Sequence, residues 1–182
     1  MPANDPTPPR LGTAPDWGAA AEAAVAAYCG WHPAPSRRET LVVSALHHSR
    51  DLRLPTLHLT QIHQIEVRTP AGWAELAEHE YEWDEAGLLR LARHRHWPMA
   101  LRGIRADVTH GWDWAEVPDI AGLIHNVSRR AASGVYGIAS QSVSGASVSY
   151  QTAGGAPLSV PLLQIEKQAL DPYRIGAGSI AG

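Results

Sequence analysis

The sequence predicts an α+β fold in which a run of short strands lies between helices. Three observations support this prediction. An alanine-rich run ends at Gly30, segments rich in β-branched and alternating residues follow as far as residue 110, and a strongly periodic helical segment begins at Pro118. Because short strands that lie close together in sequence pair most readily with their neighbours, we expect an antiparallel meander bounded by helices.

Length and composition limit the function classes. A chain of 182 residues is long enough for one domain with its own core, and a net charge of −3 argues against a nucleic-acid binder that works through a basic surface. The single cysteine, Cys29, excludes an internal disulfide, and no cysteine or histidine pair has zinc-finger spacing. Residues 1–15 are proline-rich and polar, so we expect a flexible N-terminal arm and neither a signal peptide nor a membrane anchor.

The first element is a helix over residues 16–29. Asp16 is a good N-cap, the run from Trp17 to Cys29 is almost entirely alanine, and Gly30 is a typical helix stop. The proline-containing residues 31–35 cannot continue a helix, so the chain changes here from helix to sheet.

A β-subdomain is predicted over residues 38–110. Residues 38–43 and 61–68 are rich in β-branched side chains, residues 52–54 alternate, and residues 69–72 have turn composition. Further along the chain, residues 81–83 and 87–89 predict a hairpin around residues 84–87, and residues 101–109 predict a strand that leads toward the next helix.

The segment from residue 73 to residue 105 is divided by charge. Its first half holds six acids and no Lys or Arg: Glu75, Glu78, Glu80, Glu82, Asp84 and Glu85. Its second half holds five arginines and no acid: Arg90, Arg93, Arg95, Arg102 and Arg105. Two such surfaces can attract one another, either within one chain or between two chains.

The strongest helix prediction covers residues 118–133. Pro118 suits the first turn, Asp119 complements the helix dipole, and Arg129 with Arg130 suits the last turn before Gly134. One apolar face is formed by Ile120, Leu123, Ile124, Val127 and Ala131.

The C-terminal part is predicted to contain one further helix. Residues 140–150 alternate about a glycine and are read either as a hairpin or as a mobile loop. Pro161 is expected to open a helix over residues 161–173, and residues 175–182 form a small-residue tail. The apolar residues of this helix cover more of its circumference than one core-facing stripe needs, which leaves surface for a partner: Leu162, Leu163, Ile165, Ala169 and Leu170.

Few residues favour catalysis or metal binding. The nearest approach to a chelate among ten histidines is His94-Arg95-His96, which on a strand would place both rings on one face, but no histidine matches a known ligand pattern. A dense acidic run such as residues 75–85 is more often a solvated face than a catalytic pair. Cys29 at a helix C-terminus is expected to be a packed core residue.

No nucleophile elbow, phosphate-binding loop or dinucleotide motif is present, so we expect no catalytic residue, no cofactor and no bound metal. Trp112 and Trp114 are read as packing or interface residues, with a stacking platform as the alternative.

A series of short motifs has a distinctive order. The motifs are Tyr28-Cys29-Gly30-Trp31-His32-Pro33-Ala34-Pro35, Glu39-Thr40-Leu41, Leu54-Pro55-Thr56-Leu57-His58-Leu59, Tyr81-Glu82-Trp83, Gly87-Leu88-Leu89, Trp97-Pro98, Val108-Thr109-His110-Gly111-Trp112, Val117-Pro118 and Leu170-Asp171-Pro172-Tyr173-Arg174. In this order the chain resembles the head-to-tail adaptor (connector) proteins of long-tailed, siphovirus-type phages, particularly those that infect actinobacteria. The resemblance spans about residues 14–176, although this chain is richer in histidine and differs over residues 73–80.

The resemblance implies a fold and a place of action. It implies a single adaptor domain over residues 16–174, built as a small helical bundle with an inserted antiparallel β-subdomain. The protein would form a ring, typically dodecameric, in the virion neck after synthesis in the host cytoplasm. It would join the portal protein to a stopper, head-completion or tail terminator protein, and genomic DNA would pass through the lumen without specific binding. No membrane partner and no catalytic residue is implied.

The surface residues expected at interfaces follow from these readings. They are Trp112, Trp114, Arg93, Arg95, Glu82, Asp84, Leu162, Leu163, Leu170, Tyr173 and Arg174. The charged members are expected to join subunits, with intrachain pairing as the alternative, and the C-terminal members are expected to bind the portal. Two competing classes remain at this point, a small histidine-rich metal-dependent hydrolase and a monomeric β-rich binding module.

Overall fold

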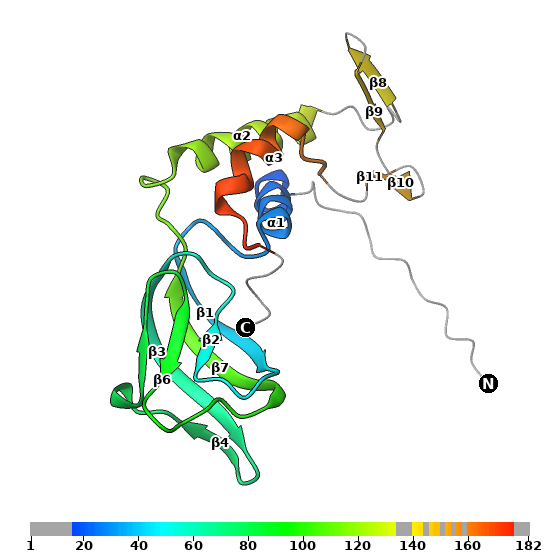
Figure 1. Cartoon of the computed structure of the whole chain (residues 1–182). Coiled ribbons are helices and arrows are strands. Elements are labelled where there is room, and N and C mark those ends of the chain that lie inside the picture. The colour runs from blue at the N-terminus through cyan, green and yellow to red at the C-terminus, as the bar shows by residue number, and fades with distance from the viewer. Residues whose placement is uncertain are drawn as a thin grey trace, which may run out of the picture.

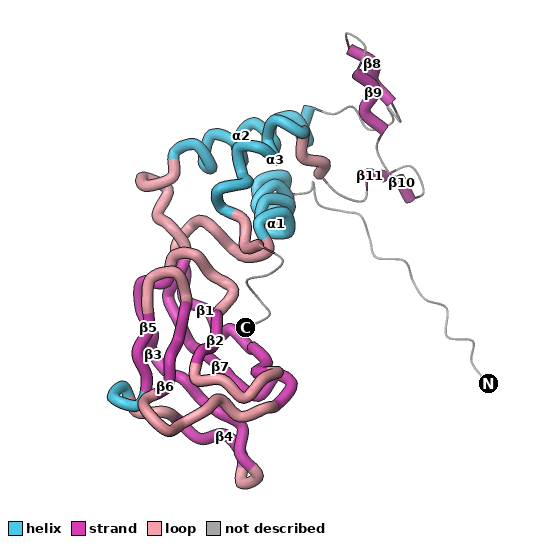
Figure 2. The backbone as a smooth tube through the Cα atoms, in the orientation of Figure 1, coloured by secondary structure: helices cyan, strands magenta, loops and turns pink. Residues whose placement is uncertain are grey.

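The structure, a computed structural model, describes residues 16–133 and 160–176 and the backbone of four short strands between them. The helices of residues 17–29, 118–133 and 164–170 gather at one end of the molecule, and the strands of residues 37–110 lie at the other (Figure 1). The chain passes from a helix into the strands and then returns to the helices (Figure 2). The fold is therefore α+β, as the sequence predicts, with the strands inserted between helices. The expected arm over residues 1–15 and the tail from residue 177 lie outside the described residues.

We call the helical end of the molecule the helical unit. It contains α1 (Trp17–Cys29), α2 (Pro118–Ser133) and α3 (Gln164–Leu170), followed by the 3-10 turn η2 (Asp171–Tyr173). Its core joins residues from three separate parts of the sequence: Ala21, Val25, Cys29, Trp31 and Ala34; Val117, Ile120, Ile124 and Val127; and Leu170 and Ile175.

Helix α1 begins and ends where the sequence predicts. The Asp16 carboxylate accepts a hydrogen bond from the Ala19 N–H at 3.0 Å and so caps the first turn. Gly30 ends the helix in the left-handed conformation, with φ of 80°. Helix α2 also spans the predicted residues and buries Ile120, Ile124 and Val127 on one face. Its amphipathic face therefore packs on α1, as periodicity indicates.

The prediction of one continuous helix over residues 161–173 is wrong. The α-helix begins at Gln164, because Leu163 has an extended backbone and its N–H donates to the Glu166 carboxylate at 2.7 Å. It gives way after Leu170 to η2, which contains Pro172. Proline lacks the N–H that an α-helical bond at this position would need, so the last turn tightens. Within residues 161–173, only the seven residues Gln164–Leu170 are α-helical.

The β-subdomain contains two antiparallel sheets. The larger has the order β1-β7-β3-β4, formed by β1 (Arg37–Ala45), β7 (Ala100–His110), β3 (Leu59–Thr69) and β4 (Gly72–Glu75). The smaller has the order β2-β6-β5, formed by β2 (Asp51–Arg53), β6 (Leu88–Leu91) and β5 (Tyr81–Trp83), which follows the 3-10 turn η1 (Glu78–Glu80).

The antiparallel pairing matches the prediction, but the meander order is wrong. The first long strand, β1, pairs with β7 and not with its neighbour β2, from Arg37↔His110 to Ala45↔Ala100. Strand length explains this choice, because β1 has nine residues and β7 eleven, whereas β2 offers only three. The hairpin predicted around residues 84–87 is present as the β5–β6 pair.

The two sheets enclose a second core, separate from that of the helical unit. Its buried residues are Ala45, Leu52, Leu54, Leu59, Ile65, Leu76, Leu89, Leu91, Trp97, Ile104, Ala106 and Val108. In the segment left open by the sequence, β8 (Ser140–Val143) pairs with β9 (Ala146–Ser149), which corresponds to the hairpin reading. The other short strands there are β10 (Thr152–Ala153) and β11 (Ala156–Pro157). Among the described helices, none has the length and apolar character needed to cross a membrane.

Candidate functional site

Trp112 lies at the junction between the helical unit and the β-subdomain. Its ring stacks on His58 with centroids 5.0 Å apart, and it meets Trp31 and Tyr173 edge-on at 5.2 and 5.4 Å. These partners come from both units, so Trp112 packs within its own chain. Trp114, two residues later, is 36% exposed and is free to contact a partner.

Main-chain hydrogen bonds fix the same junction. The Gly111 N–H donates to the His58 carbonyl and the Trp112 N–H donates to the Pro33 carbonyl, both at 2.8 Å. Gly111 has φ of 94°, and a Cβ there would lie 3.2 Å from the Pro35 carbonyl oxygen. The close approach of these two chain segments therefore requires glycine at this position.

The junction buries two histidines. His110 is 1% exposed; its Nε2 lies 2.8 Å from a Glu39 oxygen, and its Nδ1 has no hydrogen-bond partner. Burial lowers the pKa of His110, against the opposing effect of the Glu39 carboxylate. Burial also lowers the pKa of His32, whose Nε2 lies 2.8 Å from the Pro35 carbonyl oxygen. Both rings therefore favour the neutral state and serve as packed, polar core residues.

Contacts between distant parts of the sequence hold the C-terminal segment. The Tyr28 hydroxyl donates to Asp171 at 2.7 Å, the Trp31 indole N–H donates to the Tyr173 carbonyl at 2.7 Å, and the Ile175 N–H donates to the Cys29 carbonyl at 2.9 Å. The Arg174 guanidinium lies over the Tyr28 ring, 4.7 Å from its centroid. This segment is therefore clamped onto α1.

Further polar contacts connect the C-terminal segment to α2. The Tyr173 hydroxyl donates to Asp119 at 2.8 Å, and burial raises the pKa of Tyr173 to about 12. Arg130 forms an ion pair with Glu166 at 2.5 Å and donates to the Pro161 carbonyl at 2.9 Å. Tyr173, a predicted interface residue, therefore has its hydrogen-bond partner within the chain. Arg174 remains exposed above α1.

The apolar C-terminal candidates differ in exposure. Leu170 is fully buried in the helical core and Leu162 packs against that core. Leu163 and Ile165 are 37% and 72% exposed and are the large apolar side chains that this segment offers to a partner, while the small Ala169 is also exposed.

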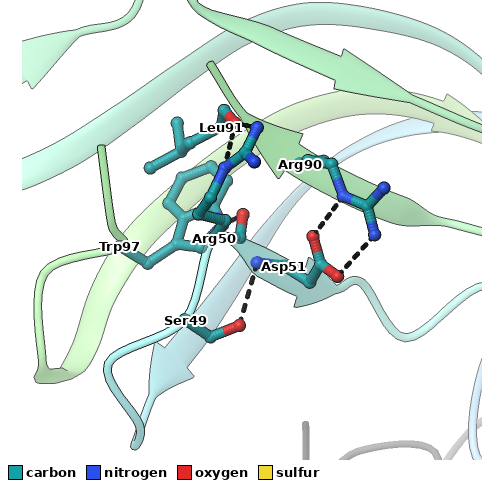
Figure 3. A network of polar contacts seen from close by, with 6 residues as sticks. All are labelled: Ser49, Arg50, Asp51, Arg90, Leu91 and Trp97. Atoms are coloured by element: carbon teal, nitrogen blue, oxygen red, sulfur yellow. Dashed lines mark hydrogen bonds and ion pairs between the residues drawn. The ribbon is translucent and has the colours of Figure 1, made fainter. Parts of the chain in front are cut away.

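The basic run is partly neutralised within the chain. Arg90 forms a two-pronged pair with Asp51, at 2.6 and 2.7 Å, and Arg50 donates to the Leu91 carbonyl (Figure 3). Arg95 pairs with Glu80, so the intrachain alternative applies to this candidate. Arg93 is exposed, and within residues 16–133 and 160–176 it has no ion pair.

The acidic candidates lie on the β5–β6 hairpin. Glu82 is opposite Arg90 in the strand register. The Asp84 carboxylate accepts from the Leu88 N–H at 2.9 Å and so organises the turn, while Glu85 lies 2.6 Å from His58 Nδ1. Asp84 therefore has a local structural role, and Glu82 remains exposed on an edge strand.

His94 and His96 do not lie on a strand, so the geometry in which both rings would share one face does not arise. They lie in the connection between β6 and β7, where His94 has φ of 67°, and His96 stacks on His48 with centroids 3.8 Å apart. Among the described residues, no three His, Cys, Asp or Glu side chains are grouped to hold a metal ion.

One exposed surface was not identified from the sequence. Leu46, Met99 and Leu101 are 55%, 65% and 74% exposed and lie beside the paired residues Ala45 and Ala100. The only sequence signal is that these apolar residues stand at the ends of strands beside histidines and arginines. Alternation alone does not predict which apolar residue at a strand end is left outside the core.

Solved structures share this fold, whereas no protein-family model and no curated protein sequence matches the chain. One similar chain belongs to the neck of a native GTA particle computed with C12 symmetry, with 16% identity, a TM-score of 0.58, and coverage of 90% of this chain and 84% of that chain. Another belongs to the neck of an empty GTA particle computed with C6 symmetry, with 18% identity, a TM-score of 0.56, and coverage of 90% and 79%. The similarity covers the helices and the inserted strands together, so it concerns the fold as a whole.

Proposed function

We propose that this protein is a structural head-to-tail adaptor of a phage or phage-like particle. It forms a ring in the neck, typically of twelve subunits, that joins the portal to the stopper, head-completion or tail terminator protein. Genomic DNA passes through its lumen without specific binding, and the protein has no enzymatic activity. It is made in the host cytoplasm and acts in the virion.

The observation that supports this proposal is the similarity of fold to a chain in a C12-symmetric neck, over 90% of this sequence. The order of short motifs along the sequence independently resembles phage adaptors. A net charge of −3 suits a conduit, because a lumen through which DNA slides should hold phosphates weakly.

The exposed apolar residues suit an assembly subunit. Leu163 and Ile165 project from the C-terminal segment, while the contacts of Tyr28 and Trp31 hold that segment in place. We assign this surface to the portal, the partner that the resemblance to adaptor proteins implies. Because the apolar pair is already held in place, binding requires little further ordering.

Co-expression with the portal protein of the same particle tests the proposal. We expect the two proteins to co-purify and electron microscopy to show a ring of this protein beneath the portal. A protein that stays monomeric and does not bind the portal would contradict the proposal and favour a monomeric binding module.

A point variant tests the portal surface. Ile165→Glu should reduce portal binding by about tenfold or more, because it places a charge at the centre of an apolar contact. Gln168→Glu adds the same charge to another exposed position of α3 and is the matched control. Truncation from Leu170 is a poor test, since it removes a buried core residue and the clamp formed by residues 171–175.

A further inference from the structure

The end of the β-subdomain farthest from the helical unit carries an apolar surface, which we call the apolar tip: Leu46, Met99 and Leu101. Ala45 pairs with Ala100 and also bridges to Met99, so these exposed side chains are close neighbours across two strands. Strand β7 has eleven residues and ends at His110 in the junction, which places the tip about 30 Å from the helical unit.

The surroundings of the apolar tip are basic. No Asp or Glu occurs in residues 91–105, the segment that contains Arg93, Arg95 and Arg102. The neighbouring loop, with His47 and His48, lies against this segment, because His48 stacks on His96 and the Trp97 N–H donates to the Ser49 carbonyl. Arg102 follows Leu101 directly and is exposed, so its charge is available at the rim of the tip.

A complementary surface lies elsewhere on the same chain. Strand β5 is the edge of the smaller sheet, and its last residue, Trp83, is 42% exposed. Next to it in the sequence are the exposed acids Glu82, Asp84 and Glu85. We call Trp83 with these acids the acidic edge. Its turn approaches the junction, since the Leu59 N–H donates to the Glu85 carbonyl and His58 pairs with Glu85.

We propose that the apolar tip of one subunit binds the acidic edge of a second copy of this chain, with Trp83 packed on Leu46, Met99 and Leu101. Exposed aliphatic side chains match an exposed tryptophan, and a basic rim matches an acidic one. The two surfaces lie at different ends of the β-subdomain, so one copy can engage two neighbours. Such a heterologous contact closes into a ring when the rotation between subunits permits it.

The inference rests on the proposed function, in that it names the contact that builds the adaptor ring. It differs from the portal contact, which we assign to Leu163 and Ile165 on α3. The two assignments can therefore fail separately.

Crosslinking between introduced cysteines tests the contact. The chain has one native cysteine, Cys29, which is fully buried and whose pKa is raised to about 11 by burial, so it should not react at neutral pH. In the full chain bound to the portal, Glu82→Cys combined with His47→Cys should give a ladder of dimers, trimers and larger species with a short bismaleimide. These exposed positions flank Trp83 and Leu46 and leave the contact side chains in place. A mixture of the two single variants should stop at dimers.

A second pair of cysteines provides the control. Glu82→Cys with Gln168→Cys has the same number of exposed thiols but should give no ladder, because Gln168 lies on α3, at a position assigned to neither contact. Adding Leu101→Glu to the first pair should lower the ladder at least about tenfold. Arg102→Glu should lower it more at low salt than at high salt, since salt screens exposed charges.

Each outcome separates the two proposals. A ring on the portal without a ladder, or a ladder of equal yield from the control pair, would overturn this contact and leave the adaptor function standing. A ladder without portal binding would support the contact and count against the adaptor function. Neither a ladder nor portal binding would overturn both.

Discussion

The helical unit and the β-subdomain stabilise their cores in different ways. The core of the helical unit joins residues from Ala21 to Ile175, and its clamps connect positions 142 and 143 residues apart, as in the contacts of Trp31 with Tyr173 and of Tyr28 with Asp171. The core of the β-subdomain comes from one continuous stretch, from Ala45 to Val108. The β-subdomain therefore has most of its core within its own segment, whereas the core of the helical unit forms only when residues 21–34, 117–127 and 170–175 come together.

This difference indicates which substitutions should destabilise each unit. Removal of a side chain from the β-subdomain leaves a cavity in a locally closed core. Loss of a C-terminal contact from the helical unit also releases a segment that closes a long loop, and loop closure has an entropic cost. Variants in each unit can test whether the two units unfold together or in separate steps.

The largest expected effect is that of Trp97→Ala in the β-subdomain. Trp97 is 1% exposed and its indole N–H donates to the Arg50 carbonyl at 2.9 Å, so truncation should lower the free energy of unfolding by about 3–5 kcal/mol. Urea denaturation followed by circular dichroism measures it. Trp83→Ala, at a largely exposed position, is the control and should cost about 1 kcal/mol or less. Equal losses from the two variants would show that Trp97 is not a core residue.

Leu170→Ala is the matching test in the helical unit. Leu170 is fully buried, and its truncation should cost about 3 kcal/mol and loosen the C-terminal segment. Hydrogen exchange should show faster exchange in α1 and α3 than in β3 and β7. Ile165→Ala, which truncates an exposed side chain of the same helix, should change stability by about 0.5 kcal/mol or less. If exchange rises equally in both units, they unfold as one.

Acid should weaken the junction between the units. The folded-state pKa of His110 lies below the ordinary value of 6.5, so the unfolded chain takes up the proton first as pH falls. The stabilisation is therefore complete above about pH 6.5 and is lost as pH falls through the lower folded pKa, by up to about 1.4 kcal/mol per pH unit. His32 contributes in the same direction.

Thermal melts between pH 7 and pH 5 measure this slope. His110→Gln should flatten it in part, since His32 remains, while His125→Gln on the exposed face of α2 should leave it unchanged. An identical slope in the wild type and the His110 variant would contradict this account of the junction.

Two ion pairs should differ in their contribution. Arg130 pairs with Glu166 in a partly buried setting and also binds the Pro161 carbonyl, so Arg130→Met should cost about 1–2 kcal/mol. Arg90 pairs with Asp51 on an exposed face, and Arg90→Met should cost less than about 1 kcal/mol. Chemical denaturation of both variants compares them. A larger loss of unfolding free energy for Arg90→Met than for Arg130→Met would contradict this ranking of the two ion pairs.

Metal removal should have no effect on either unit. We expect purified protein to contain no stoichiometric metal and its melting temperature to stay the same with a chelator, because the histidines lack ligand spacing. Elemental analysis and calorimetry measure these quantities. About one zinc per chain would contradict the expectation and revive the metal-dependent hydrolase as an alternative.

Local signals in the sequence predict most of the elements. Asp16 and Gly30 mark the limits of α1, and the apolar spacing from Ile120 to Val127 marks α2, because capping and helical periodicity act within a few residues. The pairing of β1 with β7 could not be predicted in the same way. It depends on which strands are long enough to match, a property of the whole subdomain that residues near β1 do not encode.

The candidate surfaces were predictable only in part. Periodicity indicates an apolar excess near the C-terminus, but it cannot show that Leu170 is buried while Ile165 is exposed. The charge pattern identifies Arg93 and Arg95 together, yet only the fold brings Glu80 to Arg95. Exposure of Leu46, Met99 and Leu101 depends on an irregular pairing after Val43, where the strand register shifts.

The pairing of Arg37 with His110 means that the β-subdomain leaves the helical unit and returns to it at neighbouring points. The hydrogen bond from the Trp112 N–H to the Pro33 carbonyl joins the segments that lead into and out of the β-subdomain. An insertion with adjacent entry and exit can be lengthened, exchanged or replaced during evolution with little disturbance to its host. The fold is therefore modular, with a helical frame that can stay constant while the inserted sheets diverge.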